Sequence, residues 1–196
     1  MVNANKGKNN KNAIHVCLTG HRPNKLWGYD LDVPEYDRLQ DRLENIIESL
    51  VDEYDEVVCH SGLALGADTV WSIAILNKRE EYPNKVKFHA EIPFMGQSSK
   101  WFGDSIALWE YQVEVADERT VYLNKNHCLA REDWSLVPKE EVIKAMNDRN
   151  EGMVNASDIV IAIYDGGTSG GTCNAVNYAN KVGKYVIAHH PDEFKG

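Results

Sequence analysis

Basic residues are scarce in this chain. Its 196 residues include 21 Lys and Arg against 30 Asp and Glu, a formal net charge of −9. Proteins that bind nucleic acid along their surface usually carry a basic face, which supplies contacts to the phosphate backbone. The charge balance therefore disfavours a general nucleic-acid binder, and we expect no nucleic-acid partner.

Long apolar runs are also missing. No run approaches the roughly 20 residues that cross a membrane, so we expect no membrane partner. Residues 1–12 are rich in Asn and Lys, lack the apolar segment of a secretory signal, and are predicted to be a disordered polar tail. The remainder, 13–196, is predicted to be a single domain, since 43% hydrophobic and 26% charged residues are typical of a soluble globular protein.

Closely spaced cysteines are absent. The four cysteines form no C-x-x-C pair, and none has metal-ligand spacing with the seven histidines. We therefore expect reduced thiols in a cytoplasmic protein, with neither a bound metal nor a cofactor. The cysteines are Cys17, Cys59, Cys128 and Cys173.

The most informative segment present is a glycine-rich turn after the β-branched run 159–163. Four glycines occupy seven positions in 166–172, and a helical pattern follows at 174–179. A structural turn needs one or two glycines, whereas a glycine loop at a helix N-terminus exposes backbone N–H groups to an anion. No Lys-Ser/Thr follows, so this is no Walker A motif. We expect the phosphate on residues 166–172, and the predicted ligand contacts of this segment are Asp165, Gly166, Gly167, Thr168, Gly170, Gly171, Thr172 and Asn174.

Apolar strand patterns alternate with helical ones along the chain. This alternation predicts an α/β fold, a Rossmann-like three-layer sandwich with a mainly parallel sheet. Ligands of such sheets bind at the carboxyl ends of the strands. The predicted strands are 13–18, 56–60, 86–92, 119–123, 159–163 and 185–189, and the predicted helices include 34–54, 101–116 and 139–156.

Polar loops follow three other predicted strands. Arg22 is suited to pairing with phosphate, although a solvated arginine on a turn is the alternative. His21 either contacts the ligand or caps backbone. Asp68 either bonds ribose hydroxyls or stabilises a helix N-terminus. The predicted contacts from these loops are Thr19, Gly20, His21, Arg22, Ser61, Gly62, Asp68 and Gln97, where Gln97 is equally compatible with a structural loop.

Together these motifs resemble the YpsA-like proteins of the SLOG superfamily, which also includes the DprA/Smf DNA-processing proteins and the LOG phosphoribohydrolases. The resemblance covers nearly the whole chain after the tail. It rests on the order of residues 19–23, 61–68, 93–101, 149–154 and 165–172. It implies a Rossmann-like fold that binds nucleotides or ADP-ribose-like molecules at the convergent loops.

Three functions remain open from this resemblance. The first is a homo-oligomeric sensor or sequestering protein for a nucleotide-like small molecule. The second is an N-glycosidase acting on a nucleoside monophosphate; the LOG loop ends in a catalytic Glu, but Ala175 stands at that position here and Asp165 replaces the motif's proline, so another acid would be needed. The third is a DprA-like DNA-handling module, which the acidic balance disfavours.

Overall fold

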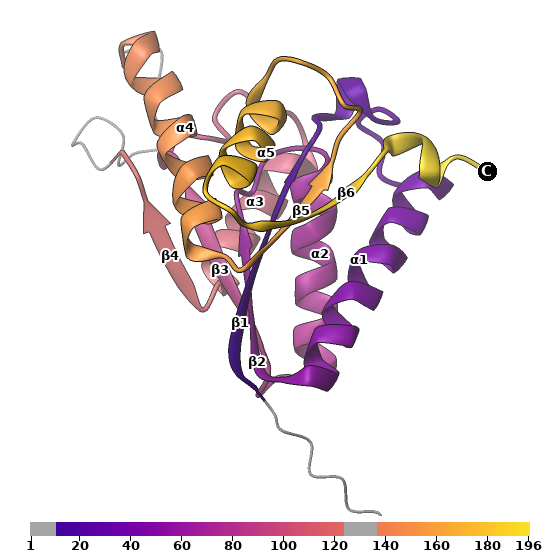
Figure 1. Ribbon diagram of the computed structural model, residues 1–196. Helices are drawn as coiled ribbons and strands as arrows, with labels where there is room; N and C mark the ends of the chain where they lie inside the picture. Colours follow the sequence, from indigo (N-terminus) through magenta and orange to yellow (C-terminus); the bar gives the residue numbers. More distant parts are fainter. Residues whose placement is uncertain (1–10, 124–136) are drawn as a thin grey trace, which may run out of the picture.

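The computed structural model describes residues 11–123 and 137–196, so most of the predicted tail, and Cys128, lie outside the described residues. A six-stranded sheet runs through the centre of the molecule (Figure 1). All five strand pairs are parallel, in the order β4-β3-β2-β1-β5-β6. The strands are β1 Lys11–Gly20, β2 Tyr54–Ser61, β3 Val86–Ile92, β4 Glu118–Val121, β5 Ile159–Ile163 and β6 Tyr185–His189.

Five α-helices connect the strands and cover both faces of the sheet. The α/β Rossmann-like prediction is confirmed, and the sheet is entirely rather than mainly parallel. Two 3-10 helices, η1 Pro23–Lys25 and η4 Pro191–Phe194, complete the described elements. The α-helices are α1 Pro34–Glu53, α2 Ala67–Glu81, α3 Asp104–Val115, α4 Lys139–Ala156 and α5 Gly171–Lys181.

The side chains of β1 alternate between two hydrophobic clusters, as the two-residue period of a strand requires. Val16 and Leu18 join the larger cluster with α1, α2 and α3, whereas Cys17 joins a smaller one with α4 and α5. Figure 1 shows α1 and α2 together beside the sheet, and α4 and α5 together on another side. The sheet is therefore the middle of three layers.

The order of connections creates a switch point between β1 and β5. From β1 the chain steps outward through β2, β3 and β4, and α4 then brings it back to β5 on the opposite side of β1. In open α/β sheets the crevice at such a reversal, outside the carboxyl ends of the strands, is the usual ligand site. The fold thus predicts a ligand site at the carboxyl ends of β1 and β5.

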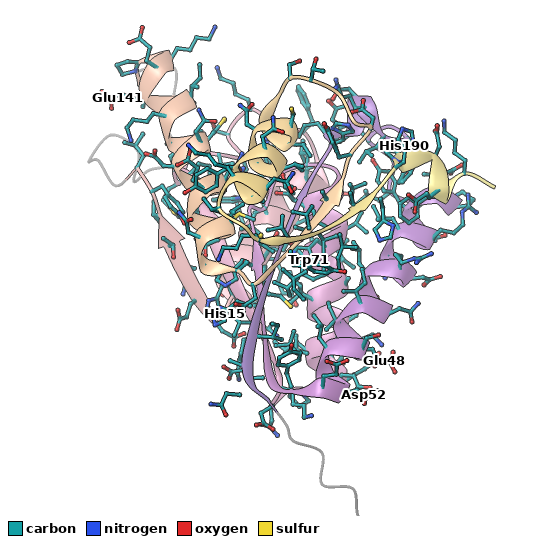
Figure 2. The ribbon with its side chains drawn as sticks, in the orientation of Figure 1. His15, Glu48, Asp52, Trp71, Glu141 and His190 are labelled. Carbon is teal, nitrogen blue, oxygen red and sulfur yellow. The ribbon has the colours of Figure 1, made fainter. Side chains whose placement is uncertain are left out.

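Trp71 anchors α2 to the sheet near this edge. Its side chain is fully buried at the centre of the molecule (Figure 2), and its Nε1–H donates a 2.9 Å hydrogen bond to the His60 carbonyl on β2. Glu48 and Asp52 lie instead toward the far end of α1 (Figure 2). A buried aromatic with its polar group satisfied fixes the start of α2 against the end of β2.

Some element boundaries differ from the sequence prediction. Thr19 and Gly20 are the last residues of β1 rather than part of a loop. The helix expected from residue 101 begins at Asp104, because Gly103 at φ +53° stands at its N-cap and residues 96–101 form hydrogen-bonded turns. None of the described helices is long and apolar enough to cross a membrane.

Candidate functional site

A cavity of about 340 Å³ lies at the switch point, and we call it the switch-point pocket. It is formed by the end of β1, the start of α2, one side of α4 and the start of α5. Eight of the sixteen predicted contacts line it, together with residues of α4 that the prediction did not include. Its polar lining comprises Thr19, Gly20, Arg22, Asp68, Asn147, Arg149, Asn150, Gly170, Gly171, Thr172 and Asn174.

The N-terminus of α5 forms one wall of this pocket. Gly170 is the N-cap at φ +103°, a conformation that favours glycine, and no side chain of the described residues caps the helix. The first amides of a helix have no intrahelical acceptors and carry the positive end of its dipole. The Thr172 hydroxyl donates a 2.9 Å hydrogen bond to the Gly20 carbonyl, which ties α5 to the end of β1.

The start of α2 is packed unusually close to β1. A Cβ atom on Gly20 would lie 2.3 Å from the Ala67 Cβ, far inside van der Waals contact. The Ala67 N–H donates to the His21 carbonyl at 3.2 Å, which fixes the same approach from the backbone side. Glycine at position 20 therefore brings the first turn of α2, with Asp68, to the pocket wall.

A buried ion pair joins α2 to α4 at the base of the pocket. Arg149 and Asp68 are 5% and 6% exposed, and Nη1 of Arg149 lies 3.4 Å from Oδ2 of Asp68. Gly62 makes room for this guanidinium, since a Cβ there would lie 1.2 Å from Nη1. Burial raises the pKa of Asp68, while the charges of Arg149 and Arg22 oppose that shift.

Nε of Arg149 is buried and has no hydrogen-bond partner among the described residues. An arginine keeps its charge in proteins, so its unmet donor favours an anionic acceptor. From the sequence alone Arg149 is compatible with either the site or the surface, and the structure places it, buried, in the pocket lining. Arg22 lines the same pocket with an exposed side chain.

The first half of the predicted glycine loop does not line the pocket. Asp165 instead bonds with the loop after β1: its N–H lies 3.1 Å from Nε2 of His21, and its Oδ1 lies 2.8 Å from the same nitrogen. The Gly167 N–H donates to Oδ1 at 3.0 Å, and this bond, followed by the one from His21, lowers the pKa of Asp165 to about 2. These contacts hold the loop after β5 against the loop after β1. Gly166 and Thr168 also lie outside the pocket lining.

Three predicted contacts lie in or against the loop after β2, outside the pocket lining: Ser61, Gly62 and Gln97. The Ser61 hydroxyl is fully buried 2.8 Å from that of Ser72. The Gln97 amide donates to the carbonyls of Gly62, at 3.0 Å, and Leu63, at 3.3 Å. All three shape the loop after β2 rather than lining the cavity.

Ala175, at the position of the LOG carboxylate, is also outside the switch-point pocket. It is buried, with 4% exposure, and follows Asn174, which does line the pocket. Asp68 is the carboxylate that lines this cavity.

A second polar cluster, which the sequence prediction missed, crosses the face of the sheet opposite the main core. Nδ1 of His15 lies 3.0 Å from Nε2 of His60, whose Nδ1 lies 2.8 Å from Oε1 of Glu91. The Tyr122 hydroxyl donates to the other Glu91 oxygen at 2.9 Å. Burial is the largest cause that lowers the pKa of His15, and the same holds for His89, whose ring packs against His60.

Comparison with known proteins places the chain in a family. The model of the YspA SLOG family matches residues 16–188, so the chain belongs to this family. It is 31% identical over 161 residues to the SPbeta prophage-derived protein YoqJ of Bacillus subtilis (strain 168), covering 79% of this chain and 89% of that protein.

Two further relatives are more distant. The chain is 24% identical over 174 residues to a UPF0398 protein of Bacillus cereus (strain B4264), covering 89% of this chain and 86% of the relative. A UPF0398 protein of Bacillus thuringiensis (strain Al Hakam) shows the same identity and coverage. The family resemblance predicted from the sequence is therefore confirmed.

Proposed function

We propose that this protein binds a phosphorylated small molecule, a nucleotide or a nucleotide derivative, in the switch-point pocket, and acts as a sensor or sequestering protein. The observation that carries the proposal is the convergence of positive groups on one cavity. The N-terminus of α5, the buried Arg149 and Arg22 all border it, and among the described residues nothing caps this helix or bonds Nε of Arg149.

The balance of charges at the pocket supports an anion rather than a cation. Asp68 is the carboxylate among the lining residues, and it is already paired with Arg149. The Arg22 charge and the helix dipole remain available to a ligand phosphate. The volume of about 340 Å³ accommodates a phosphate and its attached sugar, at the small end of the range for ligand pockets.

Mass spectrometry of small molecules that co-purify with the protein tests this proposal. We expect a phosphate ester to be released from the wild-type protein on denaturation and to be absent from a Gly171→Asp variant, which places a carboxylate at the α5 N-terminus. Release of the same compound in equal yield from both proteins would overturn the assignment of the pocket. Matched circular dichroism spectra establish that the variant is folded.

A second candidate function, cleavage of a nucleotide N-glycosidic bond, is favoured by one observation. Asp68 is a buried carboxyl at the pocket wall whose pKa is raised by burial, as a general acid requires. Incubation with a panel of nucleoside monophosphates would then yield free base and ribose 5-phosphate, and Asp68→Asn would stop the reaction. A panel that stays intact with the wild-type protein leaves binding as the function.

A further inference from the structure

A second and larger cavity, of about 1220 Å³, adjoins the switch-point pocket on the other side of the loop after β2, and we call it the aromatic pocket. Arg22 lines both cavities, so one side chain forms their common border. The loop between them contributes Leu63 to the aromatic pocket and Ala64 to the switch-point pocket. The two cavities therefore lie next to each other at Arg22.

The two cavities differ in chemistry. The aromatic pocket has Trp101 and Trp109 in its wall, with Phe102, 86% exposed, beside them. Flat ring systems stack on such side chains. Three carboxylates, with Lys100, also line it, and they disfavour a phosphate group while accepting hydrogen bonds from ring amino groups and sugar hydroxyls. These carboxylates are Asp30, Asp32 and Asp104.

Two further observations point to a ligand in the aromatic pocket. Nε2 of Gln112, a residue that is 2% exposed and lines this cavity, has no hydrogen-bond partner among the described residues. Leu63 has φ +53°, which is strained for a bulky residue, and it is held there by the bond from Gln97 to its carbonyl. Strain of this kind concentrates at ligand sites.

We propose that the aromatic pocket holds the ring end of the same ligand whose phosphate lies in the switch-point pocket, so that the ligand is a nucleoside phosphate that passes Arg22. This inference rests on the proposed function, because it assigns the second half of that site. The charges of the two cavities set the orientation: the phosphate meets Arg149 and α5, and the ring stacks on Trp101, which is half-buried, whereas Trp109 is 4% exposed and lies behind it.

The test compares ribose 5-phosphate, which has no ring base, with AMP, GMP, CMP and UMP by isothermal titration calorimetry. We expect the tightest nucleotide to bind more strongly than ribose 5-phosphate by roughly 5- to 150-fold, the range for stacking one base. A Ser105→Trp variant fills the aromatic pocket from α3. It should weaken the nucleotide at least about tenfold and leave ribose 5-phosphate unchanged.

The matched control is Ala107→Trp, which adds the same side chain to an exposed position of α3 outside the lining; it should change neither affinity. Trp101→Ala empties the pocket rather than filling it and should show the same selective loss. Equal affinity of the wild-type protein for ribose 5-phosphate and the nucleotides, or equal losses for both in Ser105→Trp, would overturn this inference alone. Failure of every phosphate compound to bind the wild-type protein would instead defeat the proposed function.

Discussion

Replacing Gly62 by alanine should dislodge the guanidinium of Arg149. The added Cβ would lie 1.2 Å from Nη1 and 2.5 Å from Cζ of Arg149, and 2.9 Å from Oδ2 of Asp68. Gly62 does not have a positive φ, so alanine itself is compatible with the backbone there. The cost therefore comes from the displaced charge and from the carboxylate that it leaves behind.

Breaking a buried ion pair by removing one partner costs about 3–5 kcal/mol. We expect Gly62→Ala to lose about 3 kcal/mol, the lower end of that range, because the raised pKa of Asp68 lets this carboxyl take up a proton. Arg149→Ala should cost about as much or slightly more. Once Arg149 is truncated, the alanine at position 62 has room, so the double variant should be no less stable than Arg149→Ala alone.

Urea denaturation of the wild type, the two single variants and the double variant measures this coupling as a double-mutant cycle. We predict strongly non-additive losses, with a coupling of about 3 kcal/mol between positions 62 and 149. Losses that add within about 0.5 kcal/mol, or a Gly62→Ala protein as stable as the wild type, would show that position 62 does not hold the Arg149 guanidinium in place.

Two further predictions follow from the support of the loops and from the histidine cluster. Gln97→Ala should lower the free energy of unfolding by about 2 kcal/mol, because it leaves the Gly62 carbonyl and the Trp109 indole N–H without their partner; an unchanged urea midpoint would contradict this. The pKa of His15 and of His89 is lowered from 6.5 in the folded protein, so the unfolded chain binds protons more readily. The contribution of these histidines to the free energy of unfolding should be complete above pH 6.5 and should fall as the pH drops below it. A urea midpoint that is constant from pH 7.5 to 5.5 would show that the two histidines are not buried in their neutral form.

The sequence predicted the fold well because apolar periodicity and glycine-rich strand ends are local signals. The limits of β3, α4, β5 and β6 agree with the predicted ranges. The predicted start of α3 was wrong. The apolar residues from Trp101 onward fit a helix, but their pattern does not reveal that Gly103 adopts a positive φ and serves as the N-cap.

The sequence could not predict which loop residues line the pocket and which bond with neighbouring loops. The glycine loop looks uniform, yet Gly170, Gly171 and Thr172 line the pocket, whereas Asp165 bonds with His21, which lies 144 positions away in the loop after β1. Arg149 becomes part of the site only because α4 returns the chain across the sheet and Gly62 leaves space for its guanidinium. Contacts of this kind depend on tertiary packing, which no local pattern encodes.

The proposed function places a ligand phosphate at the N-terminus of α5, and calorimetric titration of a Gly171→Asp variant is the direct test of that position. Space is available for the new side chain, as its Cβ would have the Asn150 Nδ2 at 3.8 Å as its neighbour. Asn180→Asp, which adds the same charge at an exposed position near the other end of α5, is the matched control. With the tightest binder among ribose 5-phosphate and the four nucleoside monophosphates, we predict that Gly171→Asp abolishes binding and that Asn180→Asp retains the wild-type affinity. Equal affinities of all three proteins, or equal losses in both variants, would show that the phosphate does not lie at the N-terminus of α5.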